Sequence, residues 1–104
     1  MIKEINSEKE LEDEIKENQK ILLIDFFAKW CGPCKIMNPI LKRFVEDNSE
    51  IDLIKVDIDK VSNLVTKYEI EEVPTFILVR NEKVLRKESG ILSNEELKQF
   101  VFNN

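Results

Sequence analysis

The chain has no histidine and contains only two cysteines, two glycines and three prolines among its 104 residues. Closed zinc or iron–sulfur sites usually need four ligands, and Cys31 and Cys34 are the only thiols. A cluster shared between two chains is the one such site that this composition leaves open. We therefore expect no bound metal. The sequence also has no apolar run near the roughly 20 residues of a membrane span, and no repeat or low-complexity tract.

Neither the acidic nor the basic residues form a long block in the sequence. The 21 acidic residues outnumber the 16 basic ones and give a formal net charge of −5. This balance predicts neither nucleic acid nor a membrane as a partner. The opening Met1-Ile2-Lys3-Glu4 runs into folded-looking sequence without the basic and apolar regions of a signal peptide. We therefore expect one globular domain over residues 1–104 that is cytoplasmic, or a mature chain already trimmed.

Apolar periodicity predicts strands that alternate with helices. Strands are expected at Ile2–Ile5, Lys20–Phe27, Ile51–Ile58, Thr75–Val79 and Lys83–Arg86, and helices after Ser7, after Pro33, between Val61 and Tyr68, and after Ser93. Lys20–Phe27 is apolar on both faces, which indicates a central strand. Ser7 and Ser93 each precede a glutamate by three positions, a capping box. The order predicts an α/β fold, a mixed sheet with helices on both faces.

The stretch Trp30-Cys31-Gly32-Pro33-Cys34 places both thiols where a predicted strand gives way to a helix. Residues three apart in a first helical turn can bring their sulfurs within bonding distance. A disulfide across so short a loop removes little entropy from the unfolded chain, so a redox role is favoured over a structural one. Glycine lets a partner chain approach, proline starts the helix without an amide partner, and both predict an exposed turn. Inert buried cysteines are the alternative.

Beyond this motif, the chain resembles the thioredoxin family along its whole length. The resemblance rests on Asp25-Phe26-Phe27-Ala28, Trp30 through Lys35, Pro39, Val73-Pro74-Thr75 and Gly90. It implies the thioredoxin fold, a central five-stranded mixed sheet flanked by four helices. The implied spatial order of the strands is 2–5, 51–58, 20–27, 75–79 and 83–86.

The resemblance also implies catalytic roles. Cys31, at the helix N-terminus that favours a thiolate, would attack a partner disulfide, and Cys34 would resolve the mixed disulfide. Asp25 interrupts an apolar run, which predicts a raised pKa, and by resemblance it exchanges a proton with Cys34. Lys55, on the adjacent predicted strand, is expected to pair with Asp25 and adjust that pKa. A structural carboxylate and a solvated lysine are the alternatives.

Substrate contacts follow from the same resemblance. It implies a cis peptide bond between Val73 and Pro74, with the proline ring denying metals access to the sulfurs and the Val73 backbone pairing with an extended substrate. Trp30 is expected to cover the site and Gly90 to leave room for the partner chain. An ordinary trans proline and a core-packed tryptophan are the alternatives.

The function implied is an enzyme, a general protein-disulfide reductase that acts on disulfide-containing client proteins. A separate thioredoxin reductase would recharge it from NADPH through a flavin, so this chain would bind no cofactor itself. We expect a monomer. A thiol oxidase or isomerase, and a binding subunit or scaffold independent of redox chemistry, are the alternatives.

Three departures from the family pattern stand out. Phe27 occupies a position where many thioredoxins have tryptophan. Glu71 and Glu72 place negative charge beside the predicted substrate groove, which predicts that acidic partners are disfavoured. Asn81-Glu82 replaces the Asn-Gly of a tight hairpin, and we predict a shifted turn type rather than a positive φ at Glu82.

Overall fold

A computed structural model describes residues 1–102 of the chain. Its elements are β1 (Ile2–Ile5), α1 (Glu8–Glu17), β2 (Ile21–Phe27), α2 (Gly32–Asp47), β3 (Ile51–Asp57), α3 (Asn63–Lys67), β4 (Thr75–Arg80), β5 (Lys83–Ser89) and α4 (Asn94–Phe102). Every predicted element is present. The main difference in bounds is at β5, which continues three residues beyond the predicted end at Arg86. None of these helices is long and apolar enough to span a membrane, within residues 1–102.

The five strands form one sheet in the order β1-β3-β2-β4-β5, as the resemblance implied. β3 pairs in parallel with both β1 and β2, whereas β4 runs antiparallel to β2 and to β5. β2 is therefore central, and six of its seven residues are buried. The predicted mixed sheet with a doubly covered central strand is confirmed.

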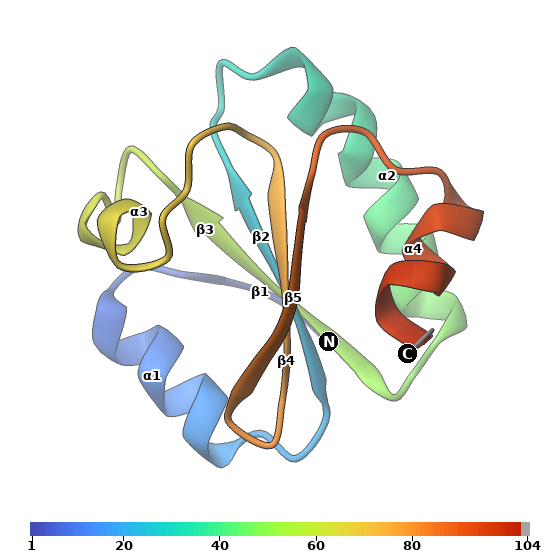
Figure 1. Ribbon diagram of the computed structural model, residues 1–104, viewed down its shortest axis with the longest axis horizontal. Coiled ribbons are helices and arrows are strands. Elements are labelled where there is room, and N and C mark those ends of the chain that lie inside the picture. The colour runs from blue at the N-terminus through green and yellow to red at the C-terminus, as the bar shows by residue number, and fades with distance from the viewer. Residues whose placement is uncertain (103–104) are drawn as a thin grey trace.

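The helices cover both faces of the sheet. Figure 1 shows α1 and α3 on one face and α2 and α4 on the other. Along β2, the side chains of Leu22, Ile24 and Phe26 join the core beneath α1 and α3, and Leu23 joins the core beneath α2 and α4. Because strand side chains alternate between faces, Asp25 shares the face of Leu23. The only acidic residue of β2 thus faces the layer that contains α2.

Of the two predicted capping boxes, the one at α4 forms completely and the one at α1 forms in part. The Ser93 hydroxyl accepts the Glu96 N–H at 3.1 Å, and the Glu96 carboxylate accepts the Ser93 N–H at 3.0 Å. At α1, the Ser7 hydroxyl accepts the Glu10 N–H at 3.1 Å, but the Glu10 carboxylate accepts from Asn6 instead of Ser7. Each serine satisfies an amide that the first helical turn leaves unpaired.

The β4–β5 turn differs from our prediction. Asn81 and Glu82 have φ angles of 52° and 65°, so the glutamate adopts the positive φ that we expected the turn to avoid. The strand register explains this result. Arg80 pairs with Lys83, which leaves two residues for the loop, and a type I′ turn, one of the two that follow the strand twist, needs positive φ at both positions. Pairing of the strands outweighs the local preference of glutamate.

Candidate active site

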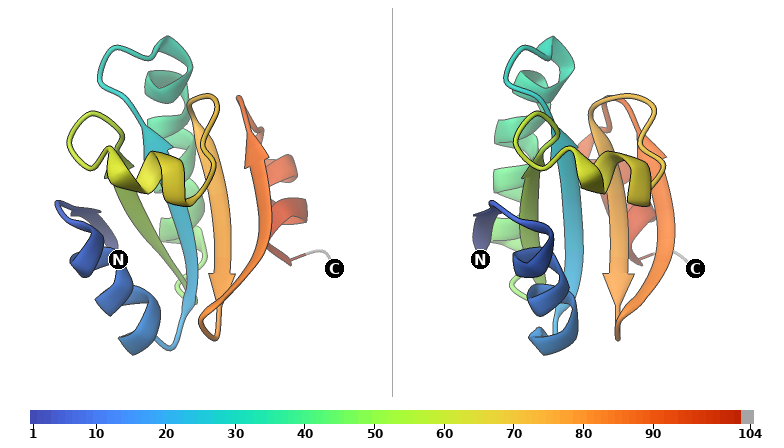
Figure 2. Two further views of the ribbon diagram at one scale, coloured as in Figure 1. Left: turned by 60° about the vertical axis from the view of Figure 1, so that its left-hand side comes forward. Right: turned by 90° about the vertical axis from the view of Figure 1, so that its left-hand side faces the viewer.

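Three connecting segments meet at one end of the sheet. Figure 2 shows the loop that follows β2, the loop that enters β4 and the segment that leaves β5 together at this end. They carry Cys31, Val73 and Gly90, respectively. Residues up to 59 positions apart in the sequence are thereby brought to one place.

Cys31 and Cys34 are joined by a disulfide, with their Cα atoms 5.3 Å apart. Cys31 caps the N-terminus of α2, and its sulfur accepts the Cys34 backbone N–H at 3.1 Å. The helix begins at Gly32, and Pro33 falls in the first turn, where a missing N–H costs nothing. Cys34 lies within the helix and is 3% exposed. The two sulfurs therefore differ in their place on the helix, because Cys31 caps its N-terminus and Cys34 lies within its first turn.

The exposed turn that we predicted around Cys31 is only partly found. Trp30 is 68% exposed, and Gly32 and Pro33 are also exposed, but Cys31 itself is only 4% exposed. The cause is tertiary, because Val73 packs against the cluster that contains this cysteine. Gly32 borders open space, since an added Cβ would meet no atom within 4 Å. No other residue of the described part of the chain thus fills the space beside this glycine.

Trp30 lies on the surface, which excludes core packing for this side chain. Its indole Nε1–H donates to Asp59 Oδ2 at 3.0 Å, and the Asp59 backbone N–H donates to Asp57 Oδ1 at 2.9 Å. Trp30 and Val73 help to line a largely apolar depression of about 260 Å³. Sequence reasoning missed Asp59, although its place just after β3 put it at this end of the sheet. The Asp59 carboxylate holds the Trp30 ring beside the disulfide through this hydrogen bond.

The Val73–Pro74 peptide bond is cis, as the resemblance implied. The Val73 carbonyl oxygen lies 3.6 Å from Cys31 Sγ. The Pro74 carbonyl accepts the Gly90 N–H at 2.9 Å, which ties the start of β4 to the end of β5. Gly90 has φ +92°, a conformation that side chains rarely adopt. The backbone conformation therefore explains why this position is a glycine. An added Cβ at Gly90 would meet no atom within 4 Å, so the surrounding space does not require a glycine.

Asp25 is a buried carboxyl with little solvation. It is 2% exposed, and within residues 1–102 its Oδ1 has no hydrogen-bond partner. Burial raises its pKa to about 7, against the opposing influence of the Lys55 charge. Asp25 and Lys55 are register partners on β2 and β3, and Lys55 Nζ lies 3.9 Å from Asp25 Oδ2. The predicted pKa rise and pairing are both found.

Lys55 has further contacts that the sequence did not suggest. Its ammonium donates to Asn38 Oδ1 at 2.7 Å and lies 4.7 Å from the centre of the Phe27 ring, a cation–π distance. The side chain is only 19% exposed, so the solvated-lysine alternative is excluded. Asn38 could have been found from its spacing, because it lies four residues after Cys34 on the same helix. The departure at Phe27 supplies one wall of this lysine site.

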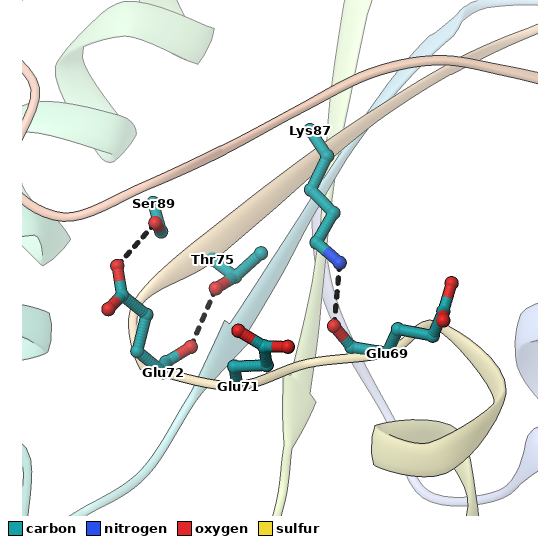
Figure 3. Close-up of a pocket in the computed structure, with 6 residues that line it drawn as sticks. All are labelled: Glu69, Glu71, Glu72, Thr75, Lys87 and Ser89. Atoms are coloured by element: carbon teal, nitrogen blue, oxygen red, sulfur yellow. Dashed lines mark hydrogen bonds between the residues drawn. The ribbon is translucent and has the colours of Figure 1, made fainter.

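An acidic depression of about 360 Å³ lies beside the loop that enters β4 (Figure 3), lined by Glu69, Glu71, Glu72, Thr75, Lys87 and Ser89. The Ser89 hydroxyl donates to the Glu72 carboxylate, and the Thr75 hydroxyl donates to the Glu72 carbonyl oxygen at 2.6 Å. In the described part of the chain, the Glu71 carboxylate has neither a hydrogen bond nor an ion pair. Glu71 and Glu72 also line the apolar depression beside Trp30, so their charge borders the predicted groove.

A disulfide at the N-terminus of a helix, held beside the Val73–Pro74 loop at the end of a five-stranded mixed sheet, defines a thiol–disulfide oxidoreductase. The family model described as Thioredoxin matches residues 2–103. The chain therefore belongs to the thioredoxin family.

Similar proteins support this assignment. The chain is 35% identical to the thioredoxin of Mycoplasmoides gallisepticum, with 96% of this chain and 99% of that protein covered. It is 32% identical to thioredoxin-2 of Saccharomyces cerevisiae, with 100% and 99% covered. Among solved structures, Plasmodium falciparum thioredoxin has a TM-score of 0.87 at 34% identity, with 94% of each chain covered. Oxidised mitochondrial thioredoxin 3 of Saccharomyces cerevisiae has a TM-score of 0.90 at 29% identity, with 99% and 95% covered.

Proposed function

We propose that the protein is a protein-disulfide reductase that reduces client proteins by dithiol–disulfide exchange. The observation that carries the proposal is the hydrogen bond from the Cys34 N–H to the Cys31 sulfur at the start of α2. In the reduced protein this amide and the helix dipole stabilise negative charge on the Cys31 sulfur. Cys31 is therefore the nucleophile.

The reaction passes through a mixed disulfide. The Cys31 thiolate attacks one sulfur of a client disulfide, a new S–S bond forms, and the second client sulfur leaves as a thiolate. Cys34, once deprotonated, attacks the Cys31 sulfur and displaces the first client sulfur. Two electrons have then moved from the protein to the client, whose two sulfurs end as thiols.

Asp25 is the proposed acceptor of the Cys34 proton, either directly or through a water. It lies on the β2 face that the layer containing α2 covers, and its pKa of about 7 lets it take up and release a proton near neutral pH. Among residues 1–102 its one nearby cation is Lys55, whose Nζ lies 3.9 Å away, beyond hydrogen-bond distance. The Asp25 carboxylate therefore has enough proton affinity to accept the proton of the Cys34 thiol, a group whose ordinary pKa is about 8.5.

The proposed client site runs along the segment that enters β4. An extended client strand would pair with the Val73 backbone, whose carbonyl lies 3.6 Å from the Cys31 sulfur. Trp30 and Pro33 offer exposed apolar surface beside it, and Gly32 and Gly90 leave room for the approaching chain. Recognition through the backbone suits a reductase with many clients.

We further propose that a thioredoxin reductase, a separate flavin protein, restores the dithiol with electrons from NADPH. The chain itself would bind no cofactor and would work as a cytoplasmic monomer. In this scheme the protein carries electrons between the reductase and client disulfides.

Insulin reduction tests the function. The wild-type protein, kept reduced by a dithiol, should precipitate insulin by cleaving its interchain disulfides. Cys34→Ser should accumulate a mixed disulfide with insulin that a non-reducing gel detects, because the resolving thiol is missing. Cys31→Ser is the matched control and should form no such adduct. Failure of the wild type to reduce insulin, with both thiols shown to be free, would overturn the proposal.

Two further measurements separate the alternatives. Equilibration with glutathione should show the protein to be the stronger reductant, whereas an oxidase or isomerase would be the weaker one. Replacing both cysteines with serine should abolish function in cells that depend on this protein. A redox-independent scaffold would keep its function after the same replacement.

A further inference from the structure

The Lys55 ammonium has two oxygen neighbours at different distances. Asn38 Oδ1 lies at 2.7 Å, within hydrogen-bond distance, and Asp25 Oδ2 lies at 3.9 Å, beyond it. The neutral amide therefore receives the hydrogen bond, while the carboxylate, the stronger acceptor, does not. Asp25 Oδ1 has no partner at all within the described residues.

We propose that Asn38 is a positioning residue that holds the Lys55 ammonium out of hydrogen-bond distance of the Asp25 carboxylate. The strand register leaves Lys55 beside Asp25 whatever the conformation of its side chain, because the two are partners on neighbouring parallel strands. α2 contributes the competing acceptor, one helical turn after Cys34. The Phe27 ring, 4.7 Å from the ammonium, is an additional contact that keeps the charge at this place.

This arrangement matters because a closer lysine would weaken Asp25 as a proton acceptor. A charge-assisted hydrogen bond from Lys55 would favour the carboxylate and lower the pKa of Asp25. The consequence for thiol exchange rests on the function proposed above, in which Asp25 accepts the Cys34 proton. The positioning of Lys55 does not depend on that function.

Few other charged groups bear on Asp25. From β3, Lys55 is its register partner, and the next acidic residue along that strand, Asp57, is engaged by the Asp59 amide. From β4, the register partner is the apolar Phe76. From α2, Cys34 does not titrate while it is in the disulfide. The oxidised protein therefore allows the Asp25 titration to be read without interference from the thiols.

Asn38→Ala tests the proposal. Asn38 is exposed on a helix and alanine favours helix, so the variant should fold. The measurement is an NMR titration of the Asp25 side-chain carboxyl carbon in the oxidised protein. With its competing acceptor gone, Lys55 should move to Asp25, and the titration midpoint should fall by about one pH unit. An unchanged or raised midpoint would overturn the proposal.

The matched control is the same change in a Lys55→Met background. If Asn38 acts through Lys55, Asn38→Ala should leave the midpoint of this background unchanged. A fall of similar size there would show a direct effect of Asn38 and would also overturn the proposal. Because no thiol exchange takes place in the titration, its result stands apart from the insulin assay. A protein that fails to reduce insulin can still show the predicted fall.

Discussion

The Val73 carbonyl oxygen lies 3.6 Å from Cys31 Sγ, although 42 residues separate the two in sequence. The segment that enters β4 and the sulfur that caps α2 therefore lie next to each other. A client strand that pairs with the Val73 backbone is placed beside the attacking sulfur by the same contact. In the proposed function, client binding and thiol exchange would be coupled through this contact.

Asp25→Asn should stabilise the folded protein above neutral pH. The pKa of Asp25 is about 7 in the folded protein and about 3.8 when unfolded, so between these values only the folded state keeps the proton. The contribution of Asp25 to the free energy of unfolding is therefore fully present below about pH 4, and it is lost as the pH rises through 7. Asparagine cannot ionise and avoids the loss, which amounts to about 4 kcal/mol at most. Urea unfolding of the oxidised proteins at several pH values measures the gain.

The matched control for this experiment is Asp52→Asn. Burial tends to raise the pKa of Asp52, but hydrogen bonds from Asn18 and the terminal ammonium of Met1 lower it overall. Its ionised form is thus favoured by folding, and removing it should destabilise the protein at neutral pH. If Asp25→Asn is no more stable than wild type at pH 8, the buried carboxyl carries no penalty and the pKa argument fails.

Trp30→Ala should impair client reduction while leaving the fold intact. The ring is largely exposed and its hydrogen bond to Asp59 is on the surface, so the cost in stability should stay near or below about 1 kcal/mol. Insulin reduction should slow because the apolar surface beside the disulfide is lost. Phe76→Ala offers a contrast, since truncating this fully buried ring should cost about 3–5 kcal/mol. If Trp30→Ala reduces insulin as fast as the wild type does, Trp30 is not part of the client site.

Charge reversal at Glu71 and Glu72 should raise the rate at which acidic clients are reduced. Both residues border the apolar depression beside the disulfide, and their charges repel an acidic client as it approaches. Stopped-flow reduction of paired acidic and basic disulfide peptides at low and high salt measures the effect, which should weaken as salt screens the charges.

A control keeps the total charge change the same. Glu46→Lys with Glu50→Lys places the new cations near the far end of α2, which is about 24 Å long. This variant should change client rates much less than the variant at the groove. Equal rates for the groove variant and wild type at low salt would show that these glutamates do not select clients.

Glu82→Gly should stabilise the β4–β5 hairpin. Glutamate at φ 65° pays a conformational cost that glycine avoids, partly offset by the greater freedom of glycine in the unfolded chain. We expect a gain of about 0.5–1 kcal/mol in the free energy of unfolding, measured by urea denaturation. Insulin reduction should not change, because the turn lies at the opposite end of β4 from Val73. A loss of stability would mean that the glutamate side chain makes a contact that outweighs its backbone cost.

The sequence determined the elements and the reactive pair of this protein, because both depend on local features. The apolar run of β2, the serine caps at Ser7 and Ser93, and the spacing of Cys31 and Cys34 need no distant residue to be interpreted. Resemblance to the thioredoxin family then supplied the strand order and the cis bond at Val73–Pro74, which local patterns could not.

Tertiary structure alone decided how the parts meet. It buried Cys31 against the β4 entry loop, gave Trp30 its partner Asp59, and forced Glu82 into positive φ through the strand register. It also brought Asn38 within hydrogen-bond distance of Lys55, a contact between a helix and a strand 17 residues further on. Distances of this kind depend on how layers pack, and periodicity along one segment carries no information about them.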